Sequence, residues 1–260
     1  RRMHIETLGS GPPLVLLHGW ALHGGVFAPL VQRLSDRYTL HLVDLPGHGF
    51  SRDSEVPLTL DATVTAILAR TPPAAWLAWS LGGLFALHAA ASSSQVRGLA
   101  MIAATPRFVR DGDWPHAVEG RVFAQFGDDL RNDYAGTLER FLALDTMGSE
   151  HARSELRTLK HDLYARGEPA PEALQQGLHL LEQSDLRATL PALSVPTLWL
   201  AGRRDLLVPT KAMQASAAVT PQATFVEIAG GGHAPFLGHA DRVAADVHRF
   251  MQALPLGATA

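Results

Sequence analysis

Short apolar runs recur along the chain, and segments with helical spacing separate them. Such runs, bounded by glycine and proline, are typical of fully buried strands. They span residues 14–17, 38–43, 75–79, 96–103, 197–201 and 224–228. The helix-length segments span residues 27–34, 61–69, 84–91, 210–218 and 242–254. Strands that alternate with helices predict an α/β fold, with a mainly parallel sheet and helices on both of its faces.

This alternation stops between residues 107 and 185. The segment contains no convincing strand, and residues 134–144 and 151–164 have the spacing of amphipathic helices. Gly167 and the Pro-Ala-Pro sequence at 169–171 predict a turn between helices. We therefore expect a core of residues 1–106 and 186–260, into which a helical cap of residues 107–185 is inserted.

Composition narrows the class of protein. Of the 260 residues, 47% are hydrophobic and 18% are charged, which excludes a disordered chain. The net charge of −3 supplies no basic field for nucleic acid. The chain has no cysteine, which excludes disulfides, thiolate catalysis and cysteine metal sites and fits the reducing cytoplasm.

An uncharged stretch at residues 71–96 is long enough by count to cross a bilayer. It contains Pro72, Pro73 and Gly82, which argue against a lipid-facing helix. A buried strand, a turn and a helix explain it better. We expect a soluble, cytoplasmic protein without a membrane partner.

The strongest local motif lies within this stretch, at Ala78-Trp79-Ser80-Leu81-Gly82. It follows a predicted strand and opens a predicted helix, which is the setting of the nucleophile elbow Gly-x-Ser-x-Gly. The turn is so sharp that the residues two before and two after the serine must be small. Gly82 keeps the pattern, and Ala78 departs from it by one methyl group. A helix N-cap is the alternative role for Ser80.

A serine nucleophile needs a base, and the base needs a carboxylate that orients it. Among 13 histidines we favour His233, because the glycines at 230–232 let its loop reach over the sheet edge. Asp205 follows the strand at 197–201, although a turn-forming aspartate is a common alternative. The order Ser80, Asp205, His233 is the one used by the α/β-hydrolase scaffold. His18 suits the shaping of its loop, and His23 and His48 lie where they could line a pocket.

An acyl-transfer site also needs hydrogen-bond donors for the oxyanion. The N–H of Leu81, at the helix start, is one candidate, and the N–H of Trp20 is the other. The turn at residues 44–49 is rich in glycine but matches no phosphate-binding pattern, so we interpret it as structural. We expect no cofactor and no metal.

With these residues in place, the chain resembles the α/β-hydrolase superfamily over nearly its full length. Within it, the chain is similar to the methyl ester esterases of biotin synthesis that act on pimeloyl-[acyl-carrier protein]. The similar stretches are residues 14–20, 39–47, 79–83, 139–144, 146–148 and 233–236. The stretches in the cap carry the narrower resemblance, because caps vary most among hydrolases.

The resemblance implies a reaction and the roles of individual residues. The reaction is hydrolysis of a methyl ester at the far end of a pimeloyl chain carried on acyl-carrier protein. Ser80 would be the nucleophile, His233 the base and Asp205 the orienting acid, while Trp20 and Leu81 would form the oxyanion hole. The acyl channel would be lined by Phe141, Leu142, Ala143, Leu144 and Asp145. The acidic carrier would be held by Arg140, Arg153 and Arg157.

The spacing of basic residues in the cap also bears on the site for the carrier. Arg153, Arg157 and Lys160 fall at i, i+4 and i+7, on one face of a helix, which suits an acidic partner. A solvated helix face is the alternative. Residues 107–187 carry 10 Lys and Arg against 15 Asp and Glu, so a carrier site must be a local patch.

Two other functions stay open at this point. The same scaffold could serve a general short-chain carboxylesterase or lactonase, with the cap arginines incidental. A ligand-binding relative could use the triad for recognition only. A haloalkane dehalogenase is disfavoured, because Ser80 stands where that enzyme needs aspartate. We expect a monomer.

Overall fold

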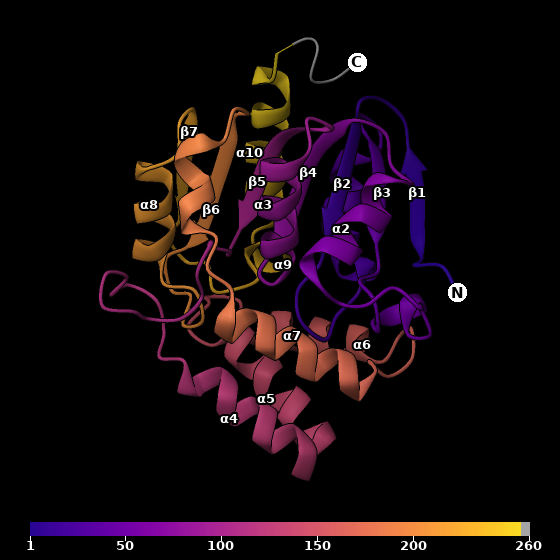
Figure 1. The fold of residues 1–260 in the computed structure, drawn as a ribbon, viewed down its shortest axis with the longest axis vertical. Coiled ribbons are helices and arrows are strands. Elements are labelled where there is room, and N and C mark those ends of the chain that lie inside the picture. Colours follow the sequence, from indigo (N-terminus) through magenta and orange to yellow (C-terminus); the bar gives the residue numbers. More distant parts are fainter. Residues whose placement is uncertain (256–260) are drawn as a thin grey trace.

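The computed structural model of the chain describes residues 1–255 and contains one seven-stranded sheet (Figure 1). The strands are β1 Ile5–Gly9, β2 Pro13–Leu17, β3 Thr39–Val43, β4 Ala74–Trp79, β5 Val96–Ile102, β6 Thr197–Gly202 and β7 Ala223–Ile228. Their order is β1-β3-β2-β4-β5-β6-β7, and only β1 runs antiparallel to its neighbour. The central strand β4 is buried along its whole length, as expected for a sheet covered on both faces.

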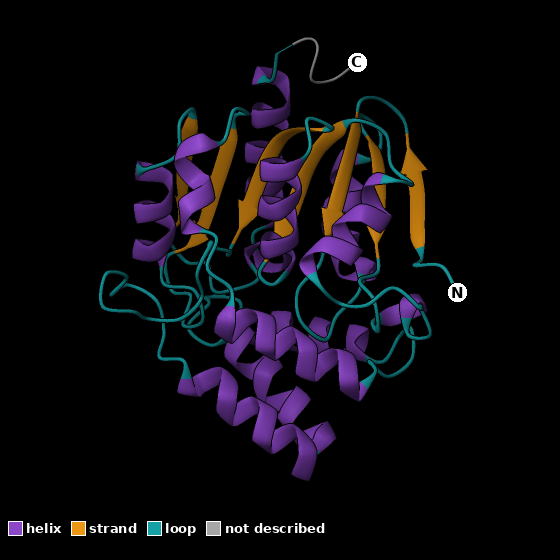
Figure 2. Ribbon diagram, viewed as in Figure 1, coloured by secondary structure: helices purple, strands orange, loops and turns teal. Residues whose placement is uncertain are grey.

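Helices cover both faces of this sheet, as Figure 2 shows. The longer core helices are α1 Ala28–Leu34, α2 Leu60–Leu68, α3 Gly82–Ser92, α8 Thr210–Ala218 and α10 Ala240–Ala253, with a short α9 at Pro235–Gly238. Helix α2 packs against α3 on one face, and α1 packs against α10. The prediction of an α/β fold with a mainly parallel sheet is confirmed.

Four helices that lie between β5 and β6 in the sequence form a separate layer. They are α4 Arg121–Asn132, α5 Tyr134–Thr146, α6 Ala152–Leu163 and α7 Pro171–Gln183. Figure 1 shows them beneath the sheet, facing the ends of the parallel strands. Because ligands of open α/β sheets bind at the carboxyl ends of the strands, these cap helices lie over the expected position of an active site.

Strand β1 was not predicted from the sequence, and the ends of some helices and strands differ from the predicted ones. Strand β1 is a five-residue edge strand whose residues are only partly buried or exposed, so it lacks the apolar run that identifies the other strands. The uncharged stretch 71–96 forms β4, the following turn and α3, as expected. Among residues 1–255, no helix combines the length and the hydropathy needed to cross a bilayer.

Candidate active site

Ser80 occupies a strained turn between β4 and α3. Its φ angle is 54°, in the left-handed region that residues other than glycine rarely adopt. A Cβ atom at Gly82 would lie 2.7 Å from the carbonyl oxygen of Leu17 and 2.6 Å from that of His18. Close packing on the β2 loop therefore requires glycine at this position. Leu81, not Ser80, is the N-cap of α3, so Ser80 does not serve as the helix cap.

His233 connects Ser80 to Asp205 through two hydrogen bonds. The Ser80 hydroxyl lies 2.8 Å from Nε2 of His233, and Nδ1 of His233 lies 2.8 Å from Oδ2 of Asp205. The indole N–H of Trp79 donates to the carbonyl oxygen of His233 at 2.8 Å and so holds its loop against the elbow. The three side chains that the sequence singles out thus form one hydrogen-bonded chain.

Asp205 also organises its own turn after β6. Its Oδ1 atom accepts hydrogen bonds from the backbone N–H groups of Leu207 and Val208, at 2.8 and 2.9 Å. One oxygen therefore stabilises the turn while the other faces His233. The turn-forming role and the orienting role, which were alternatives in the sequence, coexist in this residue.

Burial and charge act in opposite directions on His233. Burial lowers its pKa, but the negative charge of Asp205, the hydrogen bond to Asp205 and the charge of Asp145 outweigh it. The net pKa of His233 is raised. This environment stabilises the imidazolium that forms when the ring accepts a proton from Ser80.

Leu81 follows the serine in the chain, and Trp20 follows Gly19, where an added Cβ would lie 3.2 Å from the Cβ of Ser80. Within residues 1–255, neither backbone N–H donates to a protein acceptor, which an oxyanion donor requires. The Trp20 indole donates to the carbonyl oxygen of Leu174 in α7 at 2.9 Å, and its ring centroid lies 4.5 Å from that of Phe141. Trp20 therefore joins the core to the cap beside the serine.

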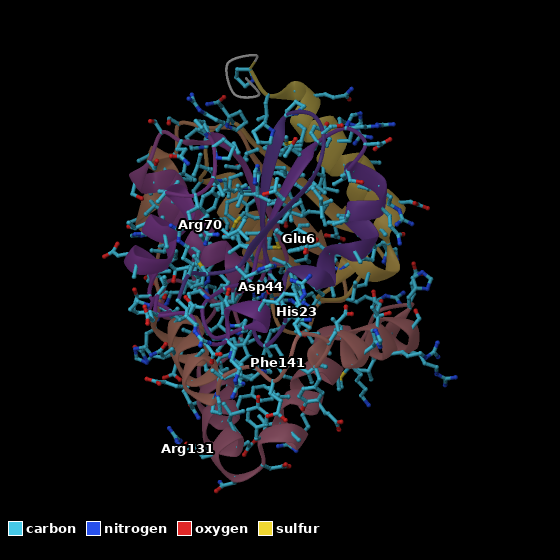
Figure 3. All side chains as sticks on the ribbon, turned by 90° about the vertical axis from the view of Figure 1, so that its right-hand side faces the viewer. Glu6, His23, Asp44, Arg70, Arg131 and Phe141 are labelled. Carbon is cyan, nitrogen blue, oxygen red and sulfur yellow. The ribbon has the colours of Figure 1, made fainter. Side chains whose placement is uncertain are left out.

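The five residues assigned to the acyl channel lie on α5. Phe141, Leu142 and Asp145 are buried, whereas Ala143 and Leu144 are half-buried. Phe141 reaches Trp20 on the core side and Phe126 in the cap, and Figure 3 shows it below Asp44, where the cap meets the sheet. The structure thus brings Phe141 to Trp20 and Asp145 to His233, and Leu142 belongs to the same hydrophobic cluster as Phe141.

Asp145 has an environment that the sequence does not reveal. Its Oδ1 atom lies 3.9 Å from Nε2 of His233, and neither of its carboxyl oxygens has a hydrogen-bond partner within the described chain. Its carbonyl oxygen accepts the backbone N–H of His233 at 3.0 Å. Burial raises the pKa of Asp145 to about 7, although His233 opposes the shift.

The histidines near the strand ends are structural. His18 donates from Nδ1 to the carbonyl oxygen of Gly19 and accepts from the N–H of Leu45 at Nε2, and burial lowers its pKa to about 3. His23 contacts the carbonyl oxygen of Asp162 in the cap, and His48 bonds within its own turn. Neither His23 nor His48 is hydrogen-bonded to the Ser80 chain.

Sequence reasoning missed an ion pair that joins the cap to the core. Arg166, which follows α6, contacts both carboxylate oxygens of Asp44 at 3.0 and 3.1 Å and reaches Glu6 at 3.4 Å. Asp44 is fully buried and also accepts from the N–H groups of Gly24 and Phe50. Figure 3 shows Glu6, His23 and Asp44 together above the cap.

The arginines assigned to the carrier differ in their surroundings. Arg153, Arg157 and Lys160 lie exposed on α6, and within residues 1–255 none of them lies within 4.0 Å of a carboxylate. Arg140 on α5 is 3.4 Å from Asp133 and 3.9 Å from Asp129. The structure therefore leaves the α6 cations available to a partner, while Arg140 is already paired.

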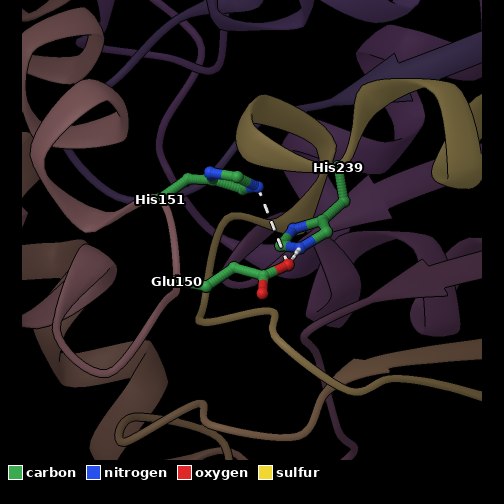
Figure 4. Close-up of side chains that lie close together, drawn as sticks. All are labelled: Glu150, His151 and His239. Carbon is green, nitrogen blue, oxygen red and sulfur yellow. Dashed lines mark hydrogen bonds and ion pairs between the residues drawn. The ribbon is translucent and has the colours of Figure 1, made fainter.

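One group of side chains in the described chain has donors suited to a metal ion. Glu150 and His151 from the cap and His239 from the core place their donor atoms within 4.8 Å of one another (Figure 4). Glu150 Oε1 already lies 2.5 Å from Nε2 of His239 and 3.6 Å from Nε2 of His151. We interpret this group as a hydrogen-bonded clasp between cap and core, named here the Glu150 clasp.

Comparison with known proteins places this geometry in a family. The profile of the family described as alpha/beta hydrolase fold matches residues 12–240. The pimeloyl-[acyl-carrier protein] methyl ester esterase of Xanthomonas axonopodis pv. citri is 69% identical, over 97% of this chain and 100% of the relative. The protein of the same name from Stenotrophomonas maltophilia strain K279a is 66% identical, over 97% of each chain.

Solved structures share the fold at lower identity. An esterase from Exiguobacterium antarcticum superposes with a TM-score of 0.86 at 23% identity, covering 96% of each chain. An enol-lactonase from Burkholderia xenovorans LB400 gives a TM-score of 0.84 at 20% identity, covering 96% of each chain. At these identities the likeness establishes the fold alone. From the family profile and the full-length relatives, the chain belongs to the α/β-hydrolase fold family and, within it, to the pimeloyl-[acyl-carrier protein] methyl ester esterases.

Proposed function

We propose that the protein is a serine carboxylesterase that hydrolyses pimeloyl-[acyl-carrier protein] methyl ester to pimeloyl-[acyl-carrier protein] and methanol in biotin synthesis. The observation that carries this proposal is the Ser80–His233–Asp205 chain, with its two 2.8 Å hydrogen bonds. This hydrogen-bonded chain occurs in a protein that is 69% identical to a relative named pimeloyl-[acyl-carrier protein] methyl ester esterase.

The geometry supports acylation of Ser80 as the first half-reaction. Nε2 of His233 accepts the Ser80 proton as Oγ attacks the ester carbonyl, while Asp205 holds the ring and stabilises the imidazolium. The N–H groups of Trp20 and Leu81 bind the oxyanion that develops. The imidazolium then gives its proton to the methoxy oxygen, methanol leaves, and the acyl group remains on Ser80.

Water completes the cycle. His233 takes a proton from water as the water oxygen attacks the acyl carbon, and then returns that proton to Ser80 Oγ as the ester bond breaks. Phe141 of α5, which packs on Trp20, is the apolar group proposed to line the path of the pimeloyl chain.

The exposed cations of α6 are the proposed contact for the carrier. The resemblance described above implies an acidic carrier protein. Arg153 and Arg157 offer positive charge without intramolecular partners in the described chain. Arg140 is a weaker candidate, because Asp129 and Asp133 already neutralise it. We further place the protein in the cytoplasm as a monomer, which cell fractionation and light scattering would test.

Replacement of the serine tests the activity. Ser80→Ala should abolish hydrolysis of the carrier-bound methyl ester and fail to restore growth of a biotin auxotroph that lacks this esterase, because no other hydroxyl contacts His233 Nε2 in the described structure. Ser92→Ala is the matched control, since Ser92 lies exposed at the other end of α3. Hydrolysis at the wild-type rate by the Ser80→Ala variant would rule out the mechanism.

Charge reversal on α6 tests the carrier site and separates it from general esterase activity. Arg153→Glu combined with Arg157→Glu should raise KM for the carrier-bound ester about tenfold and leave hydrolysis of a small soluble ester unchanged. Arg37→Glu combined with Lys211→Glu, at exposed positions outside the four cap helices, changes the net charge by the same amount and is the control. Equal effects on both substrates would favour a general carboxylesterase or lactonase.

A further inference from the structure

We propose that Asp145 is a further catalytic residue, which holds the hydrolytic water beside His233 during deacylation. The inference rests on the proposed function, because it requires an acyl group on Ser80. The sequence placed Asp145 only among the residues that line the acyl channel.

The position of Asp145 is unusual for a carboxyl group. It is 1% exposed, and both oxygens lack hydrogen-bond partners within the described chain. Buried polar groups are normally satisfied, because leaving one unpaired costs about 1–3 kcal/mol. A packing role does not explain aspartate here, since an apolar residue would fill the same space without this cost. The carboxyl group therefore has both oxygens available to a partner that the protein chain does not supply.

The distance to His233 identifies the kind of partner. At 3.9 Å, Asp145 Oδ1 is too far from Nε2 for a direct hydrogen bond. Two acceptors at this separation can both bind one water, which donates one hydrogen to each. The bond from the His233 N–H to the Asp145 carbonyl oxygen fixes the two residues relative to each other. The end of α5 and the His233 loop thus form one preorganised unit.

The deacylation step follows from this arrangement. One water hydrogen goes to Nε2 of His233 as the water oxygen forms a bond to the acyl carbon, while the other hydrogen stays bound to the Asp145 carboxyl oxygen. The tetrahedral intermediate collapses when the bond between carbon and Ser80 Oγ breaks and the Nε2 proton passes to that oxygen. The product is the free carboxylic acid, and Asp145 gains and loses no proton overall.

Methanol provides the deciding comparison, because it has a single O–H. That hydrogen must go to His233, so methanol gains nothing from Asp145. Loss of the carboxyl group should therefore slow transfer of the acyl group to water more than transfer to added methanol. A residue that acted only on the structure of the site, or on the basicity of His233, would slow both transfers alike.

The experiment uses p-nitrophenyl butyrate with and without methanol. For Asp145→Leu we expect a burst of one equivalent of nitrophenol that is slowed only as far as the weaker basicity of His233 requires, then a steady state about 100-fold slower, and at least a tenfold rise in the ratio of methyl butyrate to butyric acid. Asp145→Asn keeps one acceptor oxygen, so its deacylation rate and its product ratio should fall between those of wild type and Asp145→Leu. Thr146→Val, at the next buried position of α5, is the control and should behave as wild type.

The charge next to His233 provides a second readout. Asp145 is faced by His233 and Asp205, the titratable groups whose charges act on it, and its own charge raises the pKa of His233. The acid limb of the deacylation rate should therefore move to lower pH in Asp145→Asn, a readout that survives even if Asp145→Leu does not fold.

Three results would overturn the inference. They are wild-type deacylation in Asp145→Leu, equal slowing of acylation and deacylation, and an unchanged ratio of methanolysis to hydrolysis in the two Asp145 variants. Failure of the wild-type protein itself to form an acyl group on Ser80 would instead contradict the proposed function.

Discussion

At the scale of single residues, Ser80 and Asp145 both adopt states that folding alone disfavours. Ser80 holds a positive φ angle, which costs of order 1–3 kcal/mol for a residue with a side chain. Asp145 buries a carboxyl group without hydrogen bonds in the described structure. Because the two residues approach the same imidazole, the strain of the fold is concentrated where the chemistry is proposed to occur.

The stability of the protein should therefore depend on pH through Asp145. Its pKa is raised to about 7 in the folded chain, against about 3.9 in an unfolded one. Well below pH 4 Asp145 is protonated in both states, so its ionisation makes no contribution to stability. Between pH 4 and pH 7 the unfolded chain ionises first, so the free energy of unfolding falls, and above pH 7 the loss is complete.

Asp145→Asn removes this dependence. We expect the variant to exceed wild type in free energy of unfolding by on the order of 2 kcal/mol at pH 8 and by much less at pH 4. Urea denaturation at both pH values measures the difference. A gain of equal size at both pH values would contradict the assignment of a raised pKa.

The residues of the hydrogen-bonded chain could be predicted because local signals mark each of them. Ser80 lies in a small-x-Ser-x-small motif, and Asp205 and His233 follow predicted strands. The setting of Asp145 could not be predicted, because it depends on how the end of α5 docks on a loop almost ninety residues away. Arg166 carried no signal either, since its partner Asp44 lies 122 residues earlier.

At the scale of elements, polar contacts add to the apolar packing that attaches the cap to the core. Arg166 pairs with Asp44 on one side, and the Glu150 clasp reaches His239. The attachment at Asp44 is buried, with the Arg166 side chain 13% exposed, whereas Glu150 is 48% exposed. Since exposed ion pairs contribute about 0–1 kcal/mol, the Arg166 pair should dominate.

Removal of Arg166 should leave a buried charge without its counterion. We expect Arg166→Met to lower the free energy of unfolding by about 3 kcal/mol. Adding Asp44→Asn should recover part of this loss, because the uncompensated charge is then gone. Arg131→Met is the control, since Arg131 pairs with Asp128 on the exposed surface of α4 and should change stability by less than about 0.5 kcal/mol. Equal losses in the two arginine variants would refute the argument.

The elements themselves were mostly foreseen. Six of the seven strands have apolar runs that mark them in the sequence, and β1 lacks such a run because it lies at the sheet edge. In the cap, α5 and α6 were delimited, whereas α4 and α7 were not. The division of the chain into a cap of residues 107–185 and a core of residues 1–106 and 186–260 stays a prediction, although all four cap helices fall inside the cap segment.

At the scale of the whole molecule, the cap closes over the reacting groups. Ser80 is 2% exposed and His233 is 1% exposed, so little of either residue is open to solvent in this arrangement. We therefore expect substrate entry to involve movement of the cap, or part of it, away from the strand ends. The exposed Glu150 clasp is the contact that can break at the smallest cost.

A weaker clasp should speed access to the serine. Glu150→Gln removes the charge that faces His239 and His151, and we expect Ser80 to be labelled about threefold faster by a bulky fluorophosphonate. A small fluorophosphonate should gain less, because it needs a smaller opening. Glu172→Gln, an exposed carboxylate of α7, serves as the comparison. Identical labelling rates in all three proteins would show that the clasp does not limit entry.

The indole of Trp20 gives the molecule a built-in optical probe. Its N–H group is bonded to Leu174 of α7, and its ring lies against Phe141, so the ring loses both neighbours if the cap lifts. Its emission should then shift to the red as water arrives. The difference between wild-type and Trp20→Phe spectra isolates this signal, since the phenylalanine keeps the backbone N–H, and cap movement becomes visible in solution without any attached dye.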